Sequence, residues 1–340
     1  MASHRTERRR KRARRLPRVT AAPAFGAALG AAGAVFQNLT RNPLGSPDVI
    51  GLDAGAYTGA LVALTVLSGT SVQLAVGSVA GGLAAAVAVY LLSLGSGLGG
   101  LRSGPVRRIF VGLRRLARAL AARPDHPSTS STRETRAHAE STHQTPQALP
   151  RRSAGQGLVV IGIAVNAMLT ALNSWIVLRA ELEVAMAAVG WSAGSLNGIG
   201  WEDLRLPLAL LAALAVLLAA LARPMHQVAV GDDLAVTSGV RLSGYRPLVV
   251  LAGVGCTAIV TAVAGPVVFI ALAAPQIGRR LAGAAGVPLL PAALTGAVLL
   301  LVADLTAQTV LAPAALPVGA VTTVVGGGYL LWLFVREVRR

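Results

Sequence analysis

Residues 206–264 read LPLALLAALAVLLAALARPMHQVAVGDDLAVTSGVRLSGYRPLVVLAGVGCTAIVTAVA, which is two apolar runs on either side of a polar segment. The runs are Leu206–Leu221 and Leu248–Ala264, and the polar segment between them is Arg223–Arg246. A helix needs about 20 mostly apolar residues to cross a bilayer, and both runs come close to that length. We therefore predict two transmembrane helices joined by a segment on an aqueous side of the membrane.

The centre of the polar segment carries a helix signal of its own. Asp232 and Asp233 would lie in the first turn, where carboxylates interact favourably with the helix dipole, and Gly239 would end the helix. An apolar side would come from three residues: Leu234, Val236 and Val240. We predict a short amphipathic helix that docks a partner, and an ordinary solvated loop is the alternative.

The composition indicates an integral membrane protein. Of the 340 residues, 54% are hydrophobic and 13% are charged, and the mean hydropathy is +0.63. Soluble domains carry about 25% charged residues. Gly and Ala within the apolar runs allow close helix packing in lipid. We predict an all-α, polytopic transmembrane helix bundle with nine spans: Val19–Val35, Val49–Leu67, Val72–Leu94, Gly157–Leu178, Leu206–Leu221, Leu248–Ala264, Val267–Ile277, Leu289–Thr309 and Val318–Val335.

The connections between these spans predict the orientation through the positive-inside rule. With the C-terminal arginines inside, alternation places four further basic stretches inside: Arg41, Arg102–Arg152, Arg223–Arg246 and Arg279–Arg280. The Arg179–Arg205 connection, in which acids outnumber arginines, then lies outside. Nine spans would also leave the basic N-terminus outside, against the rule. We therefore expect a further helix upstream of Met1.

Four parts follow one another along the chain: a basic N-terminal tail (1–18), a first transmembrane part (19–100), a cytoplasmic linker insertion (101–156) and a second transmembrane part (157–340) that contains the segment 223–246. Within the insertion, Pro105–Arg123 predicts a basic amphipathic helix on the inner leaflet. Pro124–Pro150 is rich in Ser, Thr, His and Pro and predicts a disordered linker.

Several kinds of chemistry lack support in the sequence. The net charge is +17, but only 4% of the residues are aromatic, so anionic lipid explains the basic segments better than nucleic acid does. Cys256 is the single cysteine, and no Cys/His cluster or Walker A loop is present. Gly95, Gly97 and Gly100 have dinucleotide-site spacing but follow a helical run, not a strand. We expect no enzyme active site, no cofactor and no resident metal.

Asp304 is an acid within an otherwise apolar span. Ionisable groups are costly in hydrocarbon, and they either line a transport path or pair with groups on neighbouring helices. We give these two roles equal weight. An ion-coupled secondary transporter that uses Asp304 is therefore an alternative function, although no inverted internal repeat supports it.

Three stretches resemble one family of membrane proteins. They are Arg41–Gly51 (RNPLGSPDVIG), Gly231–Val240 (GDDLAVTSGV), and a series of motifs from Gly265–Pro266 to Leu331–Leu333. In combination they resemble the FecCD family of ABC-transporter permeases, the membrane subunits of importers for ferric siderophores, haem and vitamin B12. The resemblance covers the chain except Met1–Arg15 and roughly Leu101–Gln156. The first stretch is most similar to permeases for enterobactin-like catecholate siderophores.

This resemblance implies a set of partners in the cytoplasmic (inner) membrane. An ABC ATPase subunit, which carries out ATP hydrolysis, would dock on the polar segment, and an extracytoplasmic siderophore-binding protein would deliver a ferric siderophore. A second permease subunit, identical or a sister chain, would complete the path through the lipid bilayer. The resemblance assigns ATPase coupling to Gly231, Asp232, Asp233, Leu234, Ala235, Ser238 and Gly239. It assigns the translocation path or helix packing to Asn42, Pro43, Gly51, Gly55, Asp304, Pro317 and Gly319.

The function that these observations predict is import of an enterobactin-like ferric siderophore by an ATP-binding-cassette permease subunit. Import of haem or vitamin B12 is the alternative within the family. A truncated family member that does not transport is a further alternative.

Overall fold

A computed structural model describes residues 2–48, 51–67, 69–97, 154–284, 286, 288–310, 312 and 315–338. Every regular element among these residues is a helix, which confirms the predicted all-α bundle. The helices, in chain order, are α1 (Ala2–Thr40), α2 (Leu52–Val66), α3 (Ser71–Gly97), α5 (Ala154–Arg179), α6 (Leu182–Ser192), α7 (Trp201–Val230), α8 (Asp232–Thr237), α9 (Leu242–Ala264), α10 (Ile270–Leu281), α11 (Leu289–Thr309) and α12 (Val318–Val338).

Each of the nine predicted spans coincides with one of these helices. Within the described residues, six helices are long and apolar enough to cross a membrane: α3, α5, α7, α9, α11 and the Leu16–Thr40 part of α1. The prediction lacked α6, which lies inside the connection Arg179–Arg205. The predicted amphipathic helix at Pro105–Arg123 and the predicted linker at Pro124–Pro150 lie outside the described residues.

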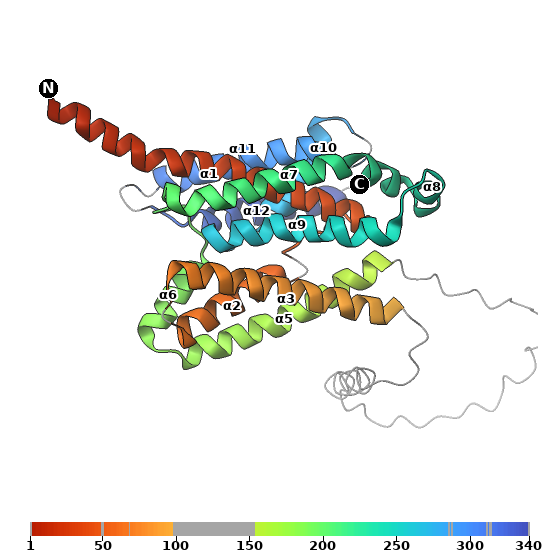
Figure 1. Cartoon of the computed structure of the whole chain (residues 1–340), viewed down its shortest axis with the longest axis horizontal. Coiled ribbons are helices and arrows are strands. Elements are labelled where there is room, and N and C mark those ends of the chain that lie inside the picture. Colours follow the sequence, from red (N-terminus) through yellow and green to blue (C-terminus); the bar gives the residue numbers. More distant parts are fainter. Residues whose placement is uncertain are drawn as a thin grey trace, which may run out of the picture.

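The helices pack in two groups (Figure 1). One group contains α2, α3, α5 and α6, and the other contains α1, α7, α9, α10, α11 and α12. Contacts of α9 with α2 and α3, and of α1 with α5, join the groups. Figure 1 shows α8 and the C-terminus at one end of the bundle and α6 and the N-terminus at the other. We refer to these two ends as the α8 end and the α6 end.

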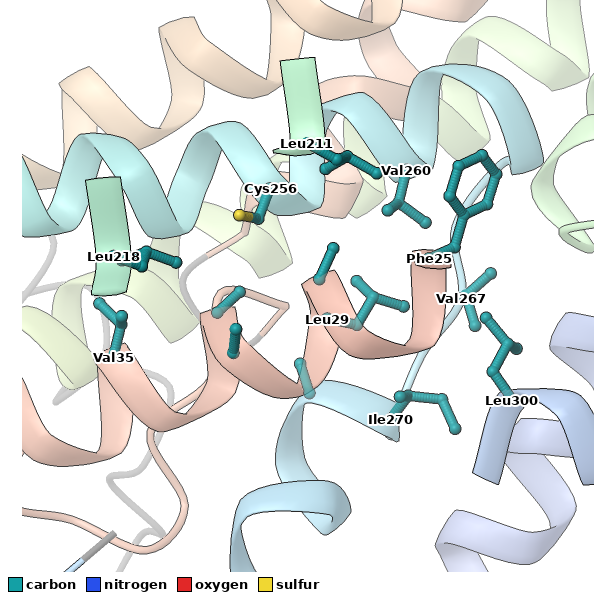
Figure 2. Close-up of a cluster of buried hydrophobic side chains, with 14 of the residues drawn as sticks. Phe25, Leu29, Val35, Leu211, Leu218, Cys256, Val260, Val267, Ile270 and Leu300 are labelled. Carbon is teal, nitrogen blue, oxygen red and sulfur yellow. The ribbon is translucent and has the colours of Figure 1, made fainter. Parts of the chain in front are cut away.

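Helix α1 lies at the centre of the larger group, because it packs against α7, α9, α10 and α11. Figure 2 shows its side chains Phe25, Leu29 and Val35 in the buried cluster that also holds Leu211 and Leu218 of α7. The cluster extends to α9, α10 and α11 through Val260, Val267, Ile270 and Leu300. Dispersion contacts of this kind, rather than exclusion of water, hold helices together in lipid.

Glycine allows α1 and α11 to approach closely. A Cβ atom added to Gly26 would lie 2.2 Å from the carbonyl oxygen of Gly296, and one added to Gly30 would lie 2.2 Å from that of Ala292. Any larger side chain at these positions would separate the two backbones. The Gly and Ala residues in the apolar runs therefore have the packing role that the sequence predicted for them.

The chain leaves the helical conformation between α9 and α10. Gly265 and Phe269 both have positive φ, at 70° and 72°, and the helix resumes at Ile270 and continues past Pro275. Proline is tolerated near the start of a helix because the first N–H groups have no helical acceptor, but Pro275 lies deeper and leaves the carbonyl of Ala271 without a helical donor.

Main-chain atoms from two other segments meet this break. The N–H of Ser195 donates to the carbonyl of Ala264 at 2.6 Å, and the N–H of Gly319 donates to the carbonyl of Gly194 at 3.1 Å. Irregular backbone is tolerated within a membrane protein only where such partners satisfy its polar groups. The connection after α6 and the start of α12 therefore form part of the same corner as the α9–α10 break.

The contact between α2 and α3 provides a test of the packing. A Cβ atom on Gly59 of α2 would lie 1.9 Å from the carbonyl oxygen of Gly77 of α3. We expect Gly59→Ala to destabilise the folded protein by roughly 1–3 kcal/mol through overpacking. The measurement is the thermal unfolding midpoint of the purified protein in detergent.

The matched control is Gly190→Ala in α6, where an added Cβ meets no atom within 4 Å. Alanine there should gain roughly 0.5–1 kcal/mol of helix propensity, so the midpoint should stay equal or rise. Equal midpoints for the two variants would contradict the close α2–α3 contact.

Candidate functional site

The short helix predicted in the polar segment is present as α8, with its ends at the predicted residues. Val240, which we predicted on its apolar side, instead follows the helix and packs against the buried core cluster. Asp232 is the first residue of α8, and Gly239, at a φ of 88°, follows its last turn. The N–H of Gly239 donates to the carbonyl of Val236 at 3.0 Å, and the N–H of Val240 donates to the carbonyl of Ala235 at 2.9 Å. This pair of bonds is the Schellman motif, which ends a helix at a left-handed glycine.

Helix α8 has one buried side and one exposed side. Ala235 is fully buried where α8 packs against α7 and α9. Leu234 and Val236 are 51% and 57% exposed. Residues two apart on an α-helix do not share a face, so these two side chains lie on either flank of the buried Ala235.

The remaining predicted coupling residues lie at the ends of α8. Gly231 has an extended backbone that separates α8 from α7. The hydroxyl of Ser238 donates to the carbonyl of Leu234 at 2.7 Å. These contacts fix the position of a six-residue helix, which is too short to be stable alone.

The two neighbouring aspartates of α8 have different surroundings. Asp232 accepts hydrogen bonds from Arg41 at 2.8 Å and from Arg246 at 2.6 Å. Asp233 is exposed, and within the part of the chain that the structure describes no arginine, lysine or histidine forms an ion pair with it. The sequence did not distinguish between these two side chains.

Three of the residues predicted for the path or for packing lie in or near the connection between α1 and α2. The side-chain oxygen of Asn42 accepts from the N–H of Leu44 at 2.9 Å, and the carbonyl of Pro43 accepts from the side chain of Gln276 at 2.6 Å. Gly51 has a φ of 88° and lies against the backbone of Asn166 in α5. The connection is thereby joined to α10 and α5.

Gly55 and Gly319 lie at close helix contacts. A Cβ on Gly55 would lie 2.6 Å from the carbonyl oxygen of Gly81 in α3, and one on Gly319 would lie 2.3 Å from that of Ala193. Pro317 immediately precedes α12, where it leads the chain into the corner beside the α9–α10 break. In this structure both glycines serve helix packing.

Asp304 pairs with an arginine across the bundle. Its carboxylate accepts three hydrogen bonds from Arg18 of α1, at 2.6 to 3.0 Å, and one from Gln308 at 2.8 Å. The two charged side chains are 4% and 15% exposed. Arg18 also donates to Asn197, which follows α6. Of the two roles predicted for Asp304, these contacts correspond to structural pairing at the α6 end.

A cavity between α2, α5 and α6, with several polar side chains in a largely apolar lining, was not predicted. It has a volume of about 510 Å³, and Asp53, Asn166, Thr170 and Ser174 are among its lining residues. One oxygen of Asp53 accepts from Thr261 at 3.4 Å, and the other is buried without a hydrogen-bond partner among the described residues.

The sequence signal that could have revealed the cavity is a polar stripe on α5. Asn166, Thr170, Asn173 and Ser174 recur at helical spacing within an apolar span, and so share one face. Asn173 itself bonds to Thr58 and to the carbonyl of Ala54, which fastens α5 to α2. No three His, Cys, Asp or Glu side chains gather as a metal site anywhere in the described residues.

Comparison with known proteins identifies the family. The model of the FecCD transport family matches residues 4–113 and 149–336. The chain belongs to this family. It is 38% identical over 326 residues to the ferric enterobactin transport system permease protein FepG of Escherichia coli K12, covering 96% of this chain and 82% of that protein. It is 30% identical over 323 residues to the Fe(3+) dicitrate transport system permease protein FecD of the same organism, covering 95% and 84%.

A solved structure has the same fold. An inward-facing conformation of a metal-chelate type ABC transporter superposes with a TM-score of 0.72 at 22% identity, covering 95% of this chain and 88% of that one. As a FecCD permease, the chain is a multi-pass protein of the cytoplasmic membrane, and it belongs to an ABC importer for an iron chelate, a siderophore or vitamin B12. It is not itself catalytic, and a permease of this kind implies an ATPase and a binding protein as partners.

The extent of the FecCD match corrects the expected extent of the resemblance at the N-terminus, and it narrows the unmatched internal stretch from 101–156 to 114–148. The match begins at residue 4, so it includes most of the basic segment that we expected to lie outside the resemblance. The structure likewise continues α1 through this segment as far as Ala2. Residues 114–148 are unmatched, and they lie inside the predicted insertion at 101–156.

The Arg18–Asp304 pair gives a test of the role of Asp304. Removing one partner of a buried ion pair costs about 3–5 kcal/mol, whereas replacing both by apolar residues is often nearly neutral. We therefore expect Asp304→Leu to lower the thermal unfolding midpoint in detergent strongly. The double variant Arg18→Leu/Asp304→Leu should recover most of the loss. A stable Asp304→Leu protein that had lost transport would instead indicate a role in the path.

Proposed function

We propose that this FecCD permease imports a ferric catecholate siderophore of the enterobactin type. The observation that carries the proposal is the 38% identity to FepG over nearly the whole chain, compared with 30% to FecD. The motif Asn42–Asp48 supports the same choice, because it has the form that resembles catecholate permeases.

The proposed ATPase contact is the exposed side of α8, formed by Leu234, Val236 and Asp233. The α8 end carries Arg41, Arg246 and the basic end of α10, which the positive-inside rule places in the cytoplasm. Alternating access needs motion at that end to reach the helices around the path. Helix α8 suits this role because a glycine bounds it on each side and because it packs on α7 and α9.

The proposed path lies beside the cavity at Asp53. A carboxylate and a stripe of amides and hydroxyls are costly next to lipid tails, so the open side of this cavity requires water or protein. A second permease subunit, identical or a sister chain, would supply the other wall. An extracytoplasmic binding protein would deliver cargo at the α6 end.

Family membership and the contacts of Asp304 weigh against an ion-coupled secondary transporter. That alternative used Asp304 as its ion-binding acid. In the structure Arg18 and Gln308 already occupy the carboxylate oxygens of Asp304.

Uptake of radiolabelled iron tests the cargo. Cells that lack other iron-chelate permeases would express this chain with the ATPase and binding protein of its own transporter. We expect uptake of ferric enterobactin, and none of ferric dicitrate, a ferric hydroxamate, haem or cobalamin. Uptake should stop when ATP is depleted. Transport of another cargo alone would replace the proposed substrate, and uptake without ATP would contradict the proposed mechanism.

Substitutions on α8 test the ATPase contact. Burying a leucine or valine side chain contributes about 1.5–3 kcal/mol, so Leu234→Ser and Val236→Ser should each weaken ATPase binding roughly tenfold or more. The measurement is recovery of the ATPase with affinity-purified permease, together with uptake. Leu281→Ser is the matched control, because Leu281 is 79% exposed in α10 and lies outside α8. Unchanged ATPase recovery in both α8 variants would exclude this surface.

A further inference from the structure

Asp232 joins three segments at the α8 end. Its two carboxylate oxygens accept from two different arginines, Arg41 at 2.8 Å and Arg246 at 2.6 Å. Arg41 directly follows α1, and Arg246 lies in the first turns of α9. Arg41 also donates to the carbonyl of Val228 in the last turn of α7, at 3.0 Å. We call Arg41, Asp232 and Arg246 the arginine–aspartate link.

The backbone at Arg41 favours this arrangement. Arg41 has a φ of 49°, one of two positive values among the non-glycine residues that the structure describes. Such a conformation costs about 1–3 kcal/mol and persists only where surrounding contacts hold it. The guanidinium group contacts both Asp232 and Val228, and the N–H groups of Leu44 and Gly45 donate to Asn42 in the same turn, so several contacts share in holding this conformation.

The small contribution of the link to the stability of the fold indicates that it has another role. The side chains of Arg41, Asp232 and Arg246 are 49%, 41% and 40% exposed. Ion pairs this exposed contribute about 0–1 kcal/mol each, because water screens them. Loss of the link should therefore leave the protein folded, so that a change in its transport activity can be measured.

Through Arg41, the arginine–aspartate link connects α8 to the end of α1. The backbone of α8 packs against α7 and α9, whereas side chains make its connection to α1. Helix α1 packs in turn against α7, α9, α10 and α11. A displacement of α8 that is carried through Asp232 therefore arrives at the end of the central helix of the bundle.

We propose that Asp232 is a positioning residue that makes α8 move together with α1 and α9, and that it transmits the motion of the ATPase without serving as its docking contact. This inference rests on the proposed function of α8. It divides the two aspartates between two roles: Asp232 binds within the permease, and Asp233 faces the partner.

The test uses the complete transporter, with permease, ATPase and binding protein in proteoliposomes. The readout is ferric enterobactin transported per ATP hydrolysed. We expect Asp232→Asn to lower this ratio about tenfold, a typical size for a coupling between sites. Recovery of the ATPase with the permease and the thermal unfolding midpoint should stay close to those of the wild type. A second readout is ATP hydrolysis in the presence and absence of the binding protein, and its stimulation should fall in parallel.

Arg279→Gln is the matched control, since it removes one charge from the last turn of α10, outside both α8 and the link, and its ratio should stay unchanged. Arg41→Gln should lower the ratio as well. The double variant Asp232→Asn/Arg41→Gln should be no worse than Asp232→Asn alone, because both changes remove one contact.

Three results would overturn the proposal. They are a wild-type ratio in Asp232→Asn, loss of ATPase recovery in that variant, and loss of the folded complex. The second would make Asp232 a docking contact, and the third a structural residue. Failure of the proposed function is separate, because it would appear as ATPase binding that survives Leu234→Ser and Val236→Ser.

Discussion

The close approach of α1 to its neighbours is the constraint on which the larger helix group depends. Lipid tails are as apolar as leucine, so helices associate in a membrane only as well as their surfaces fit. Gly26 and Gly30 bring the backbone of α1 against α11, and a Cβ on Gly33 would lie 1.7 Å from the carbonyl of Ala271 in α10. That carbonyl lacks its helical donor because residue 275 is proline. Gly33 of α1, which has no side chain, therefore lies against the one carbonyl of α10 that Pro275 leaves without a helical donor.

Arginines fix the same helix near both ends of its membrane-spanning part. Near the α6 end, Arg18 binds Asp304 of α11 and Asn197. At the α8 end, Arg41 binds Asp232 and the carbonyl of Val228. The first pair is buried and the second is half-exposed. Since removal of a partner costs far more in a buried pair than in an exposed one, the first pair contributes more to the stability of the bundle than the second.

Local patterns in the sequence predicted much of this arrangement. Hydropathy located a helix at each of the nine predicted spans, and Asp232 with Gly239 located α8 and its ends, because both signals depend only on neighbouring residues. Helix α6 was missed because 11 residues are too few to register as a span. The partner of Asp304 is 286 residues away, so nothing near Asp304 could choose between its two predicted roles. For the cavity at Asp53, the polar stripe on α5 marked only one wall in the sequence. The other walls come from α2, α6 and the α9–α10 break, and only the fold brings them together.

The corner where the α9–α10 break meets the start of α12 is built almost entirely from main-chain atoms. Its hydrogen bonds join Ser195 to Ala264 and Gly319 to Gly194 through backbone groups alone. A Cβ on Gly194 would lie 2.2 Å from the carbonyl of Pro266, and Gly194 and Gly265 both have positive φ. Substitution at this junction is thus restricted by volume and chirality rather than by polarity: any side chain at Gly194 or Gly265 would strain the backbone and meet a carbonyl oxygen, whatever its chemical character.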